Sequence, residues 1–189
     1  MRIDVAASLT MSSPAPATAL LQIAVARPAA ERLTVLTGGR PADVEEFEAD
    51  GARVHRRLVY TAGSSRPVDT AVDTLLTGQG VCRDYAHLTI TLLRALDVPA
   101  RLVAVYAPGL APMDFHAVVE ADVDGTWCVV DPTRLAPTGS LVRICSGRDA
   151  ADTAFLTLLG RRARFEAMTV TATTAGALPT PNLAPFQLP

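Results

Sequence analysis

The sequence predicts an α+β fold in which a helix carrying a cysteine packs on an antiparallel sheet, with a small β module before it. Three patterns predict this arrangement. Apolar residues recur at helical spacing after Cys82, alternating segments flank an Asp-Gly pair at 124–125, and shorter alternating segments separated by Pro and Gly occupy residues 1–60. The helix and the hairpin carry the side chains from which a function can be argued.

Cys82 is placed where a turn gives way to a helix. Gly78 and Gly80 allow the backbone to turn before it. The apolar residues that follow at helical spacing are Tyr85, Leu88, Leu92 and Leu96. In the first helical turn, unpaired backbone N–H groups and the positive end of the helix dipole favour an anion. The position therefore favours the thiolate form of Cys82, which is the nucleophilic form.

The hairpin around residues 124–125 determines which side chains share a face of the sheet. An Asp-Gly pair favours a two-residue turn between antiparallel strands, here expected at residues 115–123 and 126–131. In that register Asp131 and His116 are diagonal neighbours on one face, about 7–8 Å apart at Cα. An imidazole and a carboxylate can span this separation with a hydrogen bond.

Together these positions predict a catalytic triad, with Cys82 as nucleophile, His116 as base and Asp131 as the acid that orients the base. The same register places Cys128 on the opposite face, where we expect a packed side chain. Trp127 shares the face of His116 but lies too far along the strand to shield the site. A half-buried hairpin with a solvated His and Asp is the structural alternative.

The remaining histidines and cysteines have weaker claims to chemistry. His87 lies five residues after Cys82 and so points about 140° away from it on a helix, which favours a core or rim position. We expect His55, in a run of basic residues, to be solvated, and Cys145 to lie in the core. A zinc site formed by Cys82, Cys128 and a histidine is disfavoured because Cys128 faces away from the predicted base.

Three ordered motifs resemble the bacterial transglutaminase-like superfamily. They are Gly-Val-Cys-Arg-Asp-Tyr-Ala-His at 80–87, His-Ala-Val-Val-Glu at 116–120, and Val-Asp-Pro-Thr at 130–133, the last preceded by Trp127. The resemblance covers about residues 60–160. Two features depart from it: Val118 stands where relatives often have an aromatic residue, and the region before the cysteine is shortened.

The resemblance implies a papain-like, transglutaminase-like core with a Cys-His-Asp triad, which by motif falls on Cys82, His116 and Asp131. It implies thiol-dependent acyl transfer or amide hydrolysis of a peptide or protein amide through an acyl-enzyme, without a metal or an organic cofactor. The Cys82 backbone N–H is expected to hold the oxyanion, with Gln79 as a candidate second donor. The alternative is a non-catalytic binding or scaffold module that retains the core.

Composition excludes several other classes of protein. The 189 residues are 49% hydrophobic, and the 17 basic residues are scattered among 19 acidic ones, for a net charge of −2. Neither a nucleic acid nor a membrane is therefore an expected partner. Three cysteines without paired or metal-like spacing favour a reducing, cytoplasmic location.

The predicted organisation is a β-rich module at 1–60, a catalytic core at 61–171 and a disordered or loosely packed tail at 172–189. Within the core we expect two helices besides that of Cys82, at 68–77 and 148–159. The additional strands expected are residues 100–106, 141–145 and 165–171.

Overall fold

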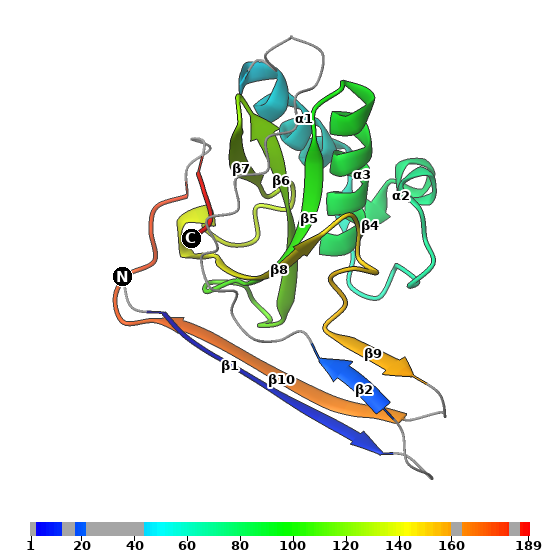
Figure 1. Cartoon of the computed structure of the whole chain (residues 1–189), viewed down its shortest axis with the longest axis vertical. Helices are drawn as coiled ribbons and strands as arrows, with labels where there is room; N and C mark the ends of the chain where they lie inside the picture. The colour runs from blue at the N-terminus through cyan, green and yellow to red at the C-terminus, as the bar shows by residue number, and fades with distance from the viewer. Residues whose placement is uncertain (1–2, 13–17, 22–43, 160–163, 182–185) are drawn as a thin grey trace.

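A four-stranded antiparallel sheet forms the centre of the fold. The computed structural model describes residues 3–12, 18–21, 44–159, 164–181 and 186–189. The strand order of the central sheet is β7-β6-β5-β8 (Figure 1). Its strands are β5 (Ala100–Tyr106), β6 (Phe115–Val123), β7 (Thr126–Val130) and β8 (Val142–Gly147). All four strands confirm the segments predicted from alternation, with small shifts at their ends.

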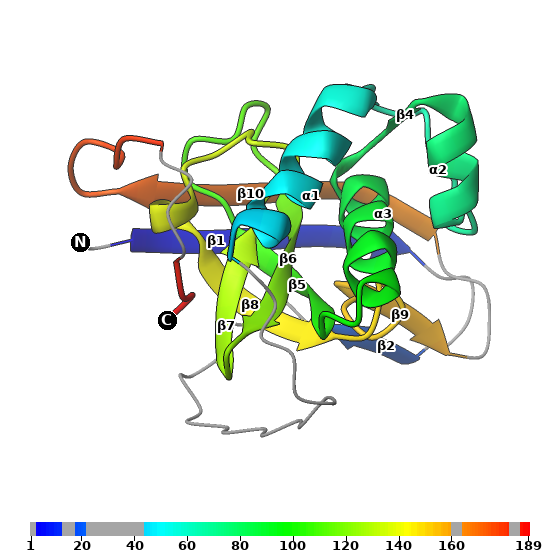
Figure 2. The same ribbon diagram turned by 90° about the horizontal axis from the view of Figure 1, so that it is seen from above.

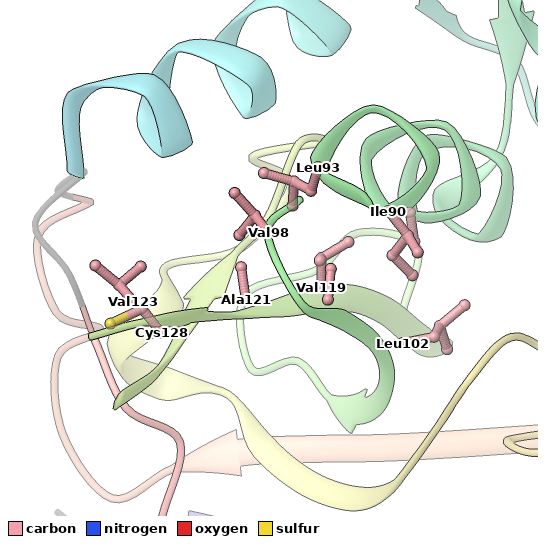
Figure 3. Close-up of a cluster of buried hydrophobic side chains, with 10 residues drawn as sticks. Ile90, Leu93, Val98, Leu102, Val119, Ala121, Val123 and Cys128 are labelled. Atoms are coloured by element: carbon pink, nitrogen blue, oxygen red, sulfur yellow. The ribbon is translucent and has the colours of Figure 1, made fainter. Parts of the chain in front are cut away.

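One face of this sheet is covered by helix α3 (Cys82–Ala95). Ile90 and Leu93 of the helix pack against Val119 and Ala121 of β6, and the side chains drawn in Figure 3 form one continuous cluster. Cys128 belongs to this cluster and is 5% exposed, which confirms that it is a packed residue on the helix side of the sheet. The amphipathic pattern after Cys82 therefore folds as predicted.

The opposite face of the sheet buries a charged residue at its centre. Glu120 is fully buried, and its carboxylate accepts hydrogen bonds from Arg101 and Arg143. The Arg101 guanidinium also lies 4.1 Å from the centre of the Trp127 ring. Because Arg101, Glu120 and Arg143 belong to β5, β6 and β8, these ion pairs connect three adjacent strands.

Phe186 and Leu188, in the segment 172–189 for which we predicted a disordered or loosely packed tail, also pack on this face. The Val129 N–H donates to the Phe186 carbonyl over 2.7 Å, and Arg143 donates to the Leu188 carbonyl. Leu188 is 7% exposed and lies in the apolar cluster on this side of the sheet. Apolar residues at the end of a polar, Pro-rich segment were the signal for this docking.

Two further helices lie beside α3 (Figure 2). Helix α2 (Ala71–Thr77) begins after a Thr70 cap, three residues later than predicted, and ends at Gly78, as the sequence predicts. Helix α1 (Val44–Arg57) lies within residues 1–60, for which we predicted a β-rich module. Its last turn carries three basic residues, His55, Arg56 and Arg57, which complement the negative end of the helix dipole.

The strands from the beginning of the chain pair with strands from its end. β1 (Ile3–Ser12) is antiparallel to β10 (Arg164–Thr174), and β2 (Thr18–Leu21) is antiparallel to β9 (Leu156–Leu159). The predicted β module therefore takes half of its strands from beyond residue 150 (Figure 1). The part of the predicted module at residues 22–43 lies outside the described residues.

The helix predicted at residues 148–159 is absent, because this segment forms turns followed by β9. The Asp152 carboxylate accepts from the Arg148 N–H and Asp149 accepts from the Ala151 N–H. Such bonds from a side chain to a nearby backbone group compete with helical hydrogen bonds. The helix was predicted from the apolar positions alone, and the hydrogen bonds of these aspartates favour turns instead.

The start of α3 is held by a short parallel pairing between β3 (Val59–Tyr60) and β4 (Gln79–Gly80). A side chain at Gly80 would place its Cβ 2.7 Å from the Cβ of Asp84 and 2.9 Å from its Oδ2. Asp84 in turn accepts a 2.8 Å hydrogen bond from the Val81 N–H. Gly80 is therefore required by close approach between the turn and the first turn of α3.

We predict that Gly80→Ala lowers the free energy of unfolding by about 1–3 kcal/mol, the usual cost of forcing an extra methyl group into a packed site. Gly176→Ala is the matched control, because nothing lies within 4 Å of the added methyl group. Urea unfolding of both variants measures the difference. Equal stability of the two variants would contradict the close approach at Gly80.

Candidate active site

Cys82 is the first residue of α3 and is half-buried. The chain reaches it from β4, so the helix start is fixed by the pairing of β4 with β3. Backbone N–H groups in the first turn of a helix have no helical acceptor and point out of its end. Cys82 therefore lies at the helix start where the sequence predicts it.

A carboxylate clamp keeps this helix start in place. Asp84 is 2% exposed; its Oδ2 accepts from the Val81 N–H and its Oδ1 accepts from the Ser65 hydroxyl, both over 2.8 Å. Arg83 donates to the same Ser65 hydroxyl over 2.6 Å. The loop before α2 is thus tied to the turn that carries Cys82.

His116 and Asp131 meet as the hairpin register predicts. Val123 pairs with Thr126, and the turn residues Asp124 and Gly125 both have positive φ, as a two-residue turn requires. The Nε2 atom of His116 lies 3.1 Å from Oδ2 of Asp131. The two residues are 2% and 7% exposed, so their interaction is shielded from water.

Thr133 contacts both members of this pair, a role that was not predicted from the sequence. Its hydroxyl donates to Oδ1 of Asp131 over 2.6 Å, and its backbone N–H donates to the same oxygen over 2.9 Å. The hydroxyl also lies 3.3 Å from Nε2 of His116. The signal was available in the Val-Asp-Pro-Thr segment, since a Thr two residues after an Asp can close a local turn.

The pKa values of the pair move in opposite directions. Burial alone would lower the pKa of His116, but the charge and hydrogen bond of Asp131, together with Cys82, raise it to about 10. Burial alone would raise the pKa of Asp131, but His116 and the two bonds from Thr133 hold it below its usual range. The geometry therefore favours an imidazolium paired with a carboxylate.

Nδ1 of His116 is the ring atom left for the thiol. Nε2 is occupied by Asp131 and Thr133, whereas Nδ1 is buried and has no hydrogen bond of standard geometry among the described residues. Cys82 interacts with this ring closely enough to raise its pKa. Contacts of this kind are often loose in a site without substrate.

The other histidines and cysteines lie away from this pair, with one correction. His55, which we expected to be solvated, is half-buried, and its Nδ1 lies 3.0 Å from the Pro132 carbonyl, so α1 supports the turn after Asp131. His87 accepts a hydrogen bond from the Ala150 N–H, and burial lowers its pKa. Cys145 is half-buried and packs beside the cluster formed by β8 and β10.

Two general features of the described residues bear on the site. No group of three or more His, Cys, Asp or Glu side chains among them is placed to hold a metal ion. None of their helices is both long enough and apolar enough to span a bilayer. Gln79, the candidate second oxyanion donor, is exposed on β4.

The family model of the transglutaminase-like superfamily matches residues 32–132, more than half of the chain. The match includes Cys82, His116 and Asp131. The chain belongs to this superfamily. Membership accounts for the antiparallel sheet with a cysteine-bearing helix on one face, the papain-like core that the motifs imply.

Two related proteins show how far the similarity extends. One is a "putative cysteine protease" from Cytophaga hutchinsonii, whose crystal structure matches this one with a TM-score of 0.69 and a sequence identity of 38%. The match covers 74% of this chain and 49% of that chain. An uncharacterised protein of Mycobacterium leprae (strain TN) is 33% identical over 110 residues, which is 52% of this chain and 38% of that protein. The chain thus spans less than half the length of either relative.

We predict that His116→Gln destabilises the protein most below pH 6.5 and progressively less as the pH rises through about 10. The folded-state pKa of about 10 lies above the ordinary 6.5, so protonation stabilises the fold fully below 6.5 and not at all above 10. Loss of one partner from a buried ion pair costs about 3–5 kcal/mol. Urea unfolding between pH 5.5 and 10.5 measures the trend.

His87→Gln is the control with the opposite sign, because the pKa of His87 is lowered. Its contribution to stability should be present above pH 6.5 and lost as the pH falls. A destabilisation by His116→Gln that does not change with pH would contradict the charged pair.

Proposed function

We propose that this protein is a thiol-dependent acyltransferase or amide hydrolase that uses Cys82 as nucleophile, His116 as general base and acid, and Asp131 as the orienting carboxylate. One observation supports this assignment most strongly: the buried His116 is held by Asp131 at Nε2, and its ring also interacts with Cys82 at a helix start. Structural histidines do not require a nucleophile at that position.

The first half of the reaction forms an acyl-enzyme. The Cys82 thiolate attacks the carbonyl carbon of an amide, a C–S bond forms, and the electron pair of the C=O bond moves to oxygen. The Cys82 backbone N–H stabilises this oxyanion. When the C–N bond breaks, the His116 imidazolium gives its proton to the departing amine, and Asp131 keeps the ring in position for this transfer.

The second half returns the free enzyme. Water or an amine attacks the thioester, the His116 ring takes its proton, and the thiolate leaves. Water gives hydrolysis and an amine gives acyl transfer. We propose a peptide or protein amide as the substrate, and the name given to the Cytophaga hutchinsonii relative favours hydrolysis.

We predict that iodoacetamide at pH 6 alkylates Cys82 at least about tenfold faster than Cys128 or Cys145, because an ion-paired thiolate reacts where ordinary thiols are protonated. Burial raises the pKa of both Cys128 and Cys145. Mass spectrometry of labelled peptides gives the three rates. Equal slow rates at all three cysteines would favour a non-catalytic scaffold instead.

We predict a graded loss of acylation by p-nitrophenyl acetate, an activated ester that reports on the thiol without the native substrate. Cys82→Ala should abolish the burst of p-nitrophenol, and His116→Ala should slow it by about 10³-fold. Asp131→Asn should cost less than His116→Ala, because an amide can still hydrogen-bond the ring but stabilises its charge poorly.

The controls separate chemistry from folding and hydrolysis from transfer. Cys128→Ser should lower stability and leave the burst intact, since that side chain lies on the helix side of the sheet. Adding hydroxylamine to the acetylated enzyme shows whether an amine competes with water for the thioester. An undiminished burst in Cys82→Ala would overturn the assignment.

A further inference from the structure

Tyr60 is brought beside the nucleophile by the short parallel pairing of β3 with β4. In that pairing Tyr60 lies opposite Gly80, two residues before Cys82. The next residue continues it, because the Thr61 N–H donates to the Gly80 carbonyl over 3.0 Å. The Tyr60 backbone is therefore fixed relative to the start of α3, although Tyr60 is 22 positions earlier in the sequence.

The Tyr60 side chain reaches along this helix start. Its ring centre lies 6.1 Å from that of Tyr85, one turn into α3, which limits how the phenol can swing. Its hydroxyl lies close enough to Cys82 that the thiol group raises the pKa of the phenol and the Cys82 backbone N–H lowers it. Tyr60 nevertheless remains 41% exposed, so the hydroxyl lies where substrate would approach the thiol.

We propose that the Tyr60 hydroxyl is the second donor of the oxyanion hole, acting together with the Cys82 backbone N–H. This inference rests on the function proposed above. Because the phenol lies beside the start of α3, an oxygen that accepts from the Cys82 N–H would also lie next to the phenol. A substrate carbonyl oxygen would take over this N–H and receive a second hydrogen bond from the phenolic O–H.

The phenol keeps the proton that such a donor needs. Burial and the interactions with Cys82 and Asp114 raise the pKa of Tyr60 to about 12, although the Cys82 backbone N–H acts in the other direction. A neutral phenol beside a thiolate does not repel the oxyanion. It also donates more strongly to that anion than to a neutral carbonyl, which is the selectivity that lowers a reaction barrier.

Tyr60 would act while the acyl-enzyme forms. As the Cys82 thiolate forms the C–S bond, the carbonyl electron pair moves to oxygen, and the O–H of Tyr60 and the N–H of Cys82 both donate to it. Collapse of the tetrahedral intermediate restores the C=O bond and breaks the bond to the leaving group. Tyr60 neither gains nor loses a proton, so it acts only by stabilising charge.

The test compares two reactions of the same thiol, one with an oxyanion and one without. Alkylation by iodoacetamide displaces iodide at a saturated carbon, whereas acylation by p-nitrophenyl acetate passes through a tetrahedral oxyanion. Tyr60→Phe should alkylate within about twofold of the unmodified protein and should acylate about 10- to 100-fold more slowly, as expected for loss of one oxyanion donor.

Tyr85→Phe is the matched control, because it removes a hydroxyl from the neighbouring ring and leaves the Tyr60 phenol in place. Both of its rates should stay within about twofold of the unmodified protein. Thermal unfolding of each variant reports on the fold. If Tyr60→Phe does not fold, Tyr60→Leu serves the same comparison, since both lack the hydroxyl.

Each other outcome has a distinct meaning. Unchanged or faster acylation in a folded Tyr60→Phe would overturn the oxyanion role and leave the proposed function standing. Equal slowing of alkylation and acylation would also overturn it, by showing that Tyr60 acts on the thiol itself. If the unmodified protein shows neither rapid alkylation nor a burst, the proposed function fails first, and the role of Tyr60 fails with it.

Discussion

The register of the β6–β7 hairpin is the constraint on which the site depends. Side chains alternate between the two faces of a strand, so a slip of one residue would send His116 and Asp131 to different faces. It would also bring the buried Cys128 out of the cluster under α3. The Asp124-Gly125 turn and the apolar cluster thus specify the same register from two sides, one by backbone conformation and one by burial.

A buried ion-pair network on β6 also holds the central sheet together. Glu120 is two pairs of residues beyond His116 on β6, hence on the same face, and its ion pairs reach β5 and β8. A buried carboxylate is costly to leave unpaired. Separation of these strands would therefore cost the ion pairs of Glu120 as well as the apolar contacts between the strands. Arg143 extends this network to the Leu188 carbonyl, which connects the end of the chain to the sheet that positions His116.

Sequence patterns correctly predicted the helices and strands that are stabilised by interactions between residues close in the sequence. The Asp-Gly turn, the alternation of the strands and the apolar spacing after Cys82 each describe a structure stabilised near its own residues, and the predicted α3, β5, β6, β7 and β8 are present. The errors arose where distant partners decide. The pairing of β1 with β10 joins the two ends of the chain, and docking of Leu188 depends on a sheet formed much earlier in the sequence.

In the candidate site, too, contacts between residues close in the sequence could be predicted and contacts between distant residues could not. Hairpin register could predict that Asp131 meets His116, and the Thr133 contacts lie within two residues of Asp131. Support from His55 could not be predicted, because α1 reaches the Pro132 carbonyl across 77 positions of sequence. Tyr60 was missed for the same reason, since its place depends on a pairing of only two residues between β3 and β4.

The hydrogen bonds at the start of α3 explain how one helix end can serve both the fold and the chemistry. Asp84 accepts from the Val81 N–H, and the Asp84 and Tyr85 N–H groups donate to the Val81 carbonyl. The Cys82 N–H takes no part in this cap and lies near the Tyr60 hydroxyl. The Asp84 carboxylate would oppose a thiolate two residues away, but Arg83 lies 3.6 Å from it and offsets its charge. The helix is therefore capped without occupying the donor that an oxyanion would need.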